Sequence, residues 1–177
     1  TGLGETDDVR YTKRGVGRVK ANEPTGSSTL AVPIVTLDSF GLFDDVDNEF
    51  LLVANVLEHI QSSLTYKADL SGEDVWQTFS ETLDLKTADC EDAAIVVTNV
   101  LSHIFHYRLG YSKQDVLAQF SLSAGYLGFQ GAKGHHSFAK WNATIDGKKQ
   151  VFYLNGVGNA PIVKKEDINY DELFNLN

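Results

Sequence analysis

Two stretches of the chain repeat apolar side chains at three- and four-residue steps, the spacing of a helix with one buried face. The first covers about residues 48–64, with Asp47 as its N-cap. Its predicted buried face consists of Phe50, Ala54, Leu57, Ile60 and Leu64. The second begins at Cys90, directly after Asp89 as N-cap, and runs to about residue 107. Its apolar stripe consists of Ala94, Val97, Leu101 and Ile104.

Two shorter signals precede the second helix. The sequence Ser71-Gly72-Glu73-Asp74 resembles a capping box and predicts a short helix through Trp76 and Phe79. Residues 30–37, LAVPIVTL, are rich in β-branched side chains, and Pro33 makes them an edge strand or extended segment.

The pattern changes to alternation after Gly110. Residues 136–144, HSFAKWNAT, alternate like a strand, Asp146-Gly147 is a hairpin turn signal, and residues 150–154 return as the partner strand. Residues 116–122 fit either a helix or a strand. We expect a glycine-punctuated loop over residues 125–134 and a short terminal helix over residues 171–176. Helices followed by antiparallel strands predict the α+β class.

The length of 177 residues fits one domain. Residues 1–28 are polar and without period, and we expect them to form an extended N-terminal arm. Residues 29–177 then form a single domain.

The net charge of -9 argues against binding to nucleic acid or to an anionic membrane, because both require basic surface. No apolar run approaches the roughly 20 residues that a membrane-spanning helix needs, so we expect no membrane insertion. The first residues lack the apolar core of a signal peptide.

A single cysteine excludes an internal disulfide and a structural zinc site built on several cysteines.

That single cysteine, Cys90, stands at the predicted first position of the central helix. A helix N-terminus carries partial positive charge and unpaired N–H groups, which favour the nucleophilic thiolate over the thiol. The alternative is a small buried apolar side chain. The flanking sequence Asp89-Cys90-Glu91-Asp92 argues against it, because a buried thiol rarely lies among three carboxylates.

A nucleophilic cysteine needs a histidine base and a group that orients it. His136 opens the predicted strand, with His135 as the alternative base. If Ile145 lies opposite Lys148, Asn155 lies opposite Phe138, within reach of His136. The oxyanion of an intermediate would be bound by the backbone amides of Cys90 and Glu91, together with the Gln77 side chain.

Two further groups allow a metal site. His103 and His106 lie three residues apart on the helix, but with no other ligand nearby in sequence a solvated or core-edge helix face explains them better than a metal site. The acidic residues Asp84, Asp89, Glu91 and Asp92 form either a solvated cluster or oxygen ligands for a cation such as Ca²⁺.

Residues 55–101 contain, in order, NVLEHIQSSLTYKAD, DVWQTFSETL and ADCEDAAI, and HSFAKW follows at residues 136–141. In this combination the chain resembles the bacterial transglutaminase-like cysteine peptidases, a periplasmic group. The resemblance implies a papain-like, transglutaminase-like core, with the nucleophile at the start of a central helix packed on an antiparallel sheet. It also implies a periplasmic or extracellular location.

Cys90 matches the nucleophile of that family, and His136 matches its general base. Asn155 stands where the family usually has Asp, and Ala88 and Ala93 replace its usual Gly and Tyr. In the calcium-dependent members, the acidic residues beside the cysteine bind the ion. The resemblance therefore implies Ca²⁺ ligands at Asp89, Glu91 and Asp92.

The sequence thus predicts a thiol hydrolase, similar to a cysteine protease, that cleaves a peptide or side-chain amide bond of a protein through Cys90, His136 and Asn155. We expect no organic cofactor. Two alternatives remain open: transglutaminase-type acyl transfer to an amine, and a catalytically silent binding or structural module. The oligomeric state is left open.

Overall fold

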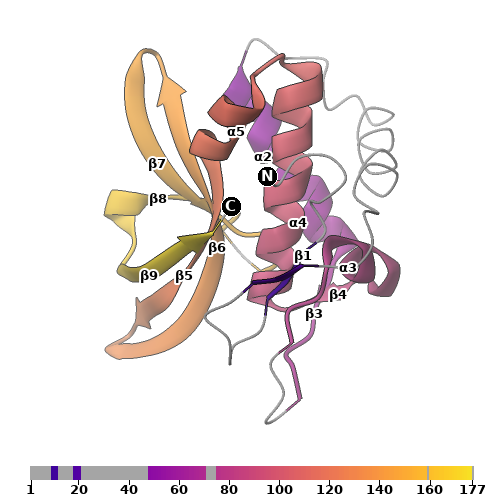
Figure 1. The fold of residues 1–177 in the computed structure, drawn as a ribbon. Coiled ribbons are helices and arrows are strands. Elements are labelled where there is room, and N and C mark those ends of the chain that lie inside the picture. The colour runs from indigo at the N-terminus through magenta and orange to yellow at the C-terminus, as the bar shows by residue number, and fades with distance from the viewer. Residues whose placement is uncertain (1–8, 12–17, 21–47, 71–74, 159, 177) are drawn as a thin grey trace.

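The computed structural model describes residues 9–11, 18–20, 48–70, 75–158 and 160–176 (Figure 1). Within the predicted arm, β1 (Val9–Tyr11) and β2 (Arg18–Lys20) pair as antiparallel strands. The predicted extended segment at residues 30–37 and the capping box at residues 71–74 lie outside the described residues, as does the boundary at residue 28.

Five antiparallel strands form the main sheet, in the order β8-β7-β6-β5-β9. Their bounds are β5 Phe120–Phe129, β6 Ala132–Ile145, β7 Lys148–Leu154, β8 Ile162–Lys164 and β9 Tyr170–Leu176. A short 3-10 helix, η2 (Lys165–Asp167), connects β8 to β9.

The helices lie on one side of this sheet (Figure 1). They are α2 (Glu49–Ser63), α3 (Phe79–Leu85), α4 (Cys90–His103), the π-helix η1 (Ile104–Arg108) and α5 (Lys113–Gln119). Two short parallel strands, β3 (Thr65–Tyr66) and β4 (Thr87–Ala88), precede the start of α4. None of the described helices has both the length and the apolar character needed to cross a bilayer.

The central helix α4 is buried on nearly all sides, because residues 93–97 are all small or β-branched and apolar, and Glu91 and Asp92 before them are buried as well. It packs on β6, whose odd-numbered side chains Ala139, Trp141 and Ala143 belong to the same core. Even-numbered side chains point to the opposite face of the sheet. The predicted α+β arrangement, with a central helix that starts at Cys90 and packs on an antiparallel sheet, is confirmed.

The predicted hairpin register is confirmed as well. Ile145 pairs with Lys148, and the turn residues Asp146 and Gly147 both have positive φ, of 52° and 75°. Positive φ at both central positions defines a type I′ turn, whose twist matches that of the flanking strands. The pairing continues to Ala139 opposite Leu154, where β7 ends.

Four local predictions are corrected. Residues 125–134 are not a loop, because β5 and β6 pair through Phe129 and Ala132 around a tight turn at Gln130 and Gly131. Residues 171–176 form strand β9 and not a helix, because β5 supplies the hydrogen bonds that so short a helix lacks. The predicted short helix does not include Trp76, because α3 begins at Phe79, after a capping box that joins Thr78 to Glu81.

The N-cap of α2 is Asn48, whose Oδ1 accepts from Leu51 N at 3.0 Å, and not the predicted Asp47. The undecided residues 116–122 contain both structures, since α5 ends at Gln119 and β5 begins at Phe120.

The segment that follows β7 lies tightly against α4. A Cβ atom added to Gly156 would lie 3.0 Å from Ala93 Cβ, from Ala93 O and from Val97 Cγ2. Gly156 thereby lets the end of the β6–β7 hairpin approach the helix that carries Cys90.

We predict that Gly156→Ala lowers the free energy of unfolding by about 1–3 kcal/mol, because the added methyl group overpacks this contact. Urea unfolding of the two proteins measures the difference. Gly134→Ala is the matched control, since an added Cβ there has no atom within 4 Å and should leave the midpoint nearly unchanged. Equal midpoints for Gly156→Ala and Gly134→Ala would contradict the tight contact.

Candidate active site

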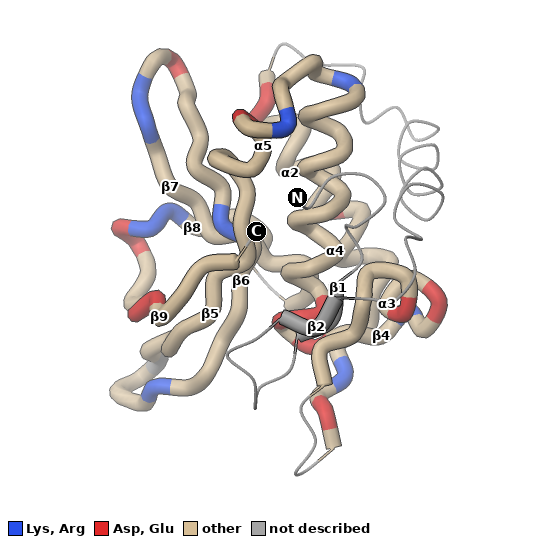
Figure 2. Tube along the Cα trace, in the orientation of Figure 1, with Lys and Arg blue, Asp and Glu red and all other residues tan. Residues whose placement is uncertain are grey.

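A reciprocal capping box starts α4. Asp89 Oδ1 accepts from Asp92 N, and Asp92 Oδ2 accepts from Asp89 N, both at 3.3 Å. Cys90 is therefore the first helical residue, as the sequence predicted. Acidic residues gather around this end of the helix (Figure 2).

Asp92 is fully buried and is held by Gln77. Its Oδ1 accepts from Gln77 N and its Oδ2 from Gln77 Nε2, each at 2.6 Å. Gln77 Nε2 also donates to Thr87 O at 3.3 Å. The donors of the Gln77 side chain are thus directed at Asp92 and Thr87, and its part in binding an oxyanion stays a prediction.

The Cys90 thiol lies between an acid and a strand. Its Sγ donates to Glu91 Oε2 at 2.9 Å, and the backbone N–H of Ser137 in β6 donates to the sulfur. Burial, followed by the negative charge of Glu91 and the hydrogen bond to it, raises the pKa of the Cys90 thiol well above its ordinary value, and the Ser137 amide lowers it. Burial and the acidic neighbours together therefore outweigh the helix N-terminus, which alone predicts a lowered pKa of the thiol.

Strand β6 brings His136 next to that amide. Because β7 ends opposite Ala139, it does not pair with the β6 backbone at His136 and Ser137. The imidazole of His136 is partly buried, and its Nε2 lies 3.2 Å from Asn155 Oδ1. The structure therefore joins Cys90 to Ser137 and His136 to Asn155 at consecutive residues of one strand. The His136 side chain points to the face of β6 away from α4 and packs on Phe138, so the route from the Cys90 sulfur to the imidazole runs past the edge of β6 that β7 leaves open.

Asn155 has a fixed orientation. Its Nδ2 donates to Ala160 O at 3.1 Å, its backbone N donates to Pro161 O at 2.9 Å, and its carbonyl accepts from Gln61 Nε2 at 2.9 Å. Because a carbonyl only accepts, the Nδ2 atom must face Ala160 and the Oδ1 atom must face His136.

This orientation determines the tautomer of His136. An amide oxygen can only accept, so His136 Nε2 carries the proton, and the Nδ1 of the neutral ring keeps its lone pair. Burial lowers the pKa of His136, and the hydrogen bond to Asn155 partly offsets that effect. A neutral imidazole with an open Nδ1 lone pair can act as a general base.

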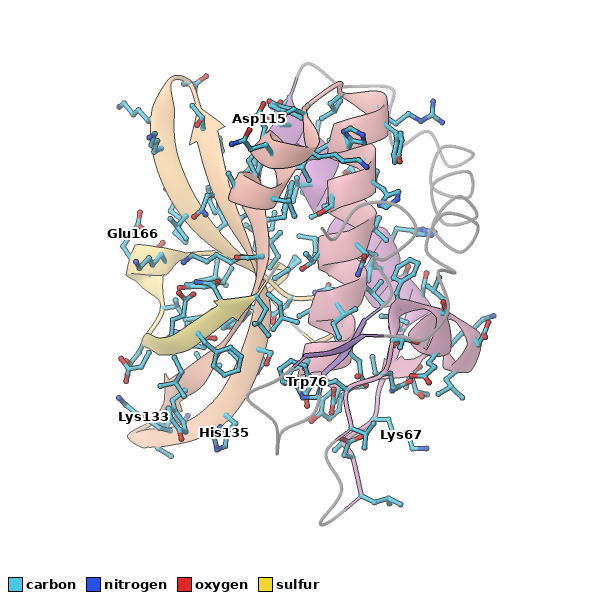
Figure 3. The ribbon with its side chains drawn as sticks, in the orientation of Figure 1. Lys67, Trp76, Asp115, Lys133, His135 and Glu166 are labelled. Carbon is cyan, nitrogen blue, oxygen red and sulfur yellow. The ribbon has the colours of Figure 1, made fainter. Side chains whose placement is uncertain are left out.

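His135 has different surroundings. It is exposed, and its ring lies 4.6 Å from the ring of Tyr126, its cross-strand partner. Adjacent residues of a strand point to opposite faces, so His135 and His136 cannot share one position. Figure 3 shows His135 on β6, with Lys67 and Trp76 at the same end of the molecule.

Three carboxylates converge beside Cys90. Oxygen atoms of Asp69, Asp89 and Glu91 lie within 4.8 Å of one another. Burial and the charges of Glu91 and Asp92 raise the pKa of Asp89, which shows that its negative charge is poorly compensated. This group contains two of the predicted ligands, and Asp69 stands in it where Asp92 was predicted.

Sequence reasoning did not select Asp69, although the residue ends the NVLEHIQSSLTYKAD motif.

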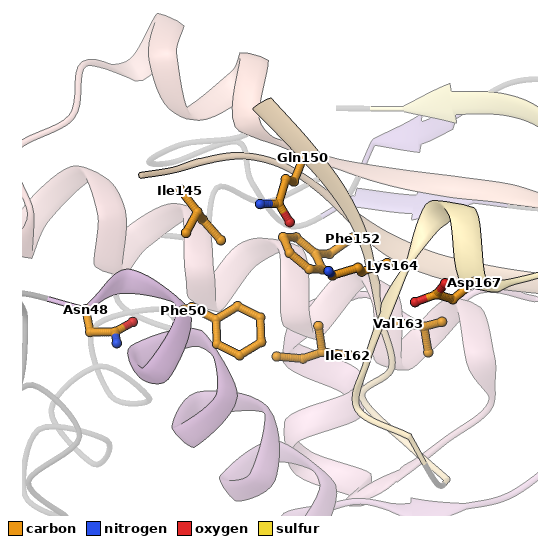
Figure 4. A pocket seen from close by; sticks show the side chains of 9 residues that line it. All are labelled: Asn48, Phe50, Ile145, Gln150, Phe152, Ile162, Val163, Lys164 and Asp167. Atoms are coloured by element: carbon orange, nitrogen blue, oxygen red, sulfur yellow. The ribbon is translucent and has the colours of Figure 1, made fainter. Parts of the chain in front are cut away.

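A hollow of about 520 Å³ lies elsewhere, between the start of α2 and the edge formed by β7 and β8 (Figure 4). None of the candidate residues lines this hollow; its walls include Phe50, Phe152 and Ile162.

No protein-family model matches the chain, and no curated protein matches it. Among solved structures, the chain is similar to calcium-bound LapG of Legionella pneumophila, with a TM-score of 0.48 and 18% sequence identity. The similarity covers 68% of this chain and 63% of the LapG chain, so it leaves more than a third of that chain unmatched.

Proposed function

We propose that this protein is a thiol hydrolase that cleaves a peptide or side-chain amide bond of a protein substrate. Cys90 is the nucleophile, His136 the general base and Asn155 the residue that orients the imidazole. The observation that carries the proposal is the 3.2 Å contact of His136 Nε2 with a fixed Asn155 Oδ1, one residue away from the amide that contacts the Cys90 sulfur.

In the proposed reaction, His136 Nδ1 accepts the thiol proton while the Cys90 sulfur attacks the carbonyl carbon of the substrate. The tetrahedral oxyanion forms near the first N–H groups of α4, which have no partner within the helix. Collapse of the intermediate breaks the C–N bond, and the imidazolium gives its proton to the departing amine. Water, activated by the same imidazole, then hydrolyses the thioester and restores the thiol.

The Cys90–Glu91 hydrogen bond opposes this sequence, because it directs the thiol proton to Glu91 and not to His136. A cation held by Asp69, Asp89 and Glu91 would neutralise these carboxylates. It would also compete with the Cys90 thiol for the Glu91 carboxylate. Their spacing fits Ca²⁺, since oxygen ligands about 2.3–2.6 Å from one ion lie within about 5 Å of each other. When bound, Ca²⁺ would supply positive charge beside the thiol.

The same hydrogen bond favours a second candidate, a catalytically silent binding module that retains the fold. In such a module Cys90 stays protonated at neutral pH with or without Ca²⁺. The reaction of the thiol with an alkylating agent separates the two candidates.

We predict that Cys90 reacts with iodoacetamide at neutral pH in the presence of Ca²⁺ at least as fast as the same thiol in urea-denatured protein. His136→Gln should slow the reaction about tenfold or more, because the proton acceptor is lost. Mass spectrometry of the alkylated protein gives the rates. A native thiol that is inert with and without Ca²⁺ would support the silent module.

The matching activity assay follows hydrolysis of labelled casein, with Cys90→Ala as the inactive reference. Incorporation of a labelled primary amine in place of hydrolysis would indicate acyl transfer by the same thioester.

For Asn155→Ala, we expect a lower kcat with little change in KM, because the imidazole loses the acceptor that fixes its ring. The lost hydrogen bond also lowers the pKa of His136, so the acidic limb of the pH–rate profile should move to lower pH. Asn142→Ala is the control, since Asn142 is exposed on β6, the strand of His136, and donates to Ala118 O. Equal profiles for the two variants would rule out the orienting function.

We predict that Ca²⁺ raises the melting temperature and that a chelator reverses the effect. At a free Ca²⁺ concentration of 100 times Kd, binding stabilises the fold by about 2.7 kcal/mol. Asp69→Asn should remove most of this shift, whereas Asp84→Asn should keep it, because Asp84 is exposed on α3 and outside the convergent group. Differential scanning fluorimetry measures the melting temperature of each variant with and without Ca²⁺. Equal Ca²⁺-induced shifts in the two variants would exclude the site.

The pH dependence of stability gives an independent check. The raised pKa of Asp89 means that the folded protein retains a proton which the unfolded chain loses above pH 3.8. Without Ca²⁺, stability should therefore fall as the pH rises from 3.8 to the raised pKa of Asp89, about 9, and level off above it. Saturating Ca²⁺ should flatten this dependence, because the bound ion favours the ionised carboxylate.

A further inference from the structure

Behind His136, on the face of the sheet away from α4, three aromatic rings form a second packed cluster. The centroids of Phe138, Tyr153 and Tyr170 are 4.9–5.2 Å apart. The ring of His136 packs on this cluster, with its centroid 4.3 Å from that of Phe138 in an edge-on arrangement. The imidazole therefore has an aromatic support that contains a residue of β9.

A chain of hydrogen bonds runs through the cluster to the backbone of His136. Glu172 accepts from Lys140 Nζ at 3.1 Å and from Ser123 Oγ at 2.6 Å. Because the Ser123 proton points at the carboxylate, the one proton of the Tyr170 hydroxyl is shared between two acceptors, Ser123 Oγ at 3.0 Å and the carbonyl oxygen of His136. The same hydroxyl lies 3.4 Å from the carbonyl oxygen of His136.

The strand that carries Tyr170, β9, lies unusually close to β5 at Gly125. Gly125 pairs with His136 on one side and with Glu172 on the other. A Cβ atom at Gly125 would lie 2.1 Å from Asp171 O, and the β5–β9 register shifts between Ala124 and Gly125. Only a glycine at this position lets β9 approach β5 so closely beside the residue that pairs with His136.

We propose that Tyr170 is a positioning residue for His136, an inference that rests on the proposed thiol chemistry. Pairing between β6 and β7 stops at Ala139, so β7 does not hold the backbone at His136. The Tyr170 hydroxyl bonds the His136 carbonyl, and the Tyr170 ring supports Phe138, which contacts the imidazole. Together these contacts keep His136 Nε2 on Asn155 and leave Nδ1 for the thiol proton.

The test compares Tyr170→Phe with Tyr153→Phe in the full chain. Both changes remove one hydroxyl from the same aromatic cluster and keep the ring. Only Tyr170 reaches the His136 carbonyl, whereas the Tyr153 hydroxyl lies 3.5 Å from Glu172. The readout is the ¹⁵N chemical shift of the His136 ring nitrogens, which reports the populations of the two neutral tautomers.

We expect Tyr170→Phe to reduce the population of the Nε2–H tautomer and to lower kcat several-fold at nearly constant KM. Tyr153→Phe should leave both quantities as in the unsubstituted protein. A loss of stability alone would affect the two variants alike and would not change the tautomer ratio in only one of them.

Two results are separable. An unchanged tautomer population in Tyr170→Phe overturns the positioning function, whether or not Cys90 reacts. A Cys90 thiol that stays unreactive in the unsubstituted protein overturns the thiol chemistry, and the tautomer shift is measured independently of it.

Discussion

The packing of α4 against β6 is the constraint on which the rest of the structure depends. The helix is buried from Glu91 to Val97, so its axis and its starting point are set by the sheet behind it. The capping box between Asp89 and Asp92 fixes which residue comes first in the helix, and that residue is Cys90. The early end of β7 leaves the Ser137 amide available to the sulfur. The position of Cys90 relative to β6 follows from this single interface.

Electrostatics at the site act in two directions. The helix N-terminus and the Ser137 amide favour a thiolate, while burial and the carboxylates around Cys90 favour a thiol. In this structure burial and the carboxylates together prevail and raise the pKa of the thiol, because the sulfur is largely removed from water and Glu91 lies in direct hydrogen-bond contact with it. Reactivity of the thiol thus depends on how Asp69, Asp89 and Glu91 are compensated, which connects the candidate cation site to the candidate nucleophile.

Local signals in the sequence predicted the parts of the site that local physics controls. The Asp146-Gly147 turn sets the hairpin register, and an acidic N-cap before an apolar helix sets the position of Cys90. Contacts between distant segments were not predictable in this way. Gln77 holds Asp92 across fifteen positions of sequence, and this long-range contact turns Asp92 away from the carboxylate group that Asp69 joins. Likewise, Gly125 and Gly128 indicated a loop, but they are small because the strand β9 and Asn169 approach them closely.

The contact between Gly156 and Ala93 has a consequence for comparing this chain with others. Ala93 stands where the resembling peptidases usually have a tyrosine, which suggests a lost function when the position is considered alone. Here the small side chain is half of a steric pair, because Gly156 and Ala93 approach to a distance that leaves no room for an aromatic ring at either position. The two positions should therefore vary together among homologues, with size at one compensated by size at the other. Co-variation of these two positions, and not the identity of residue 93, is the feature that would mark a chain with this geometry.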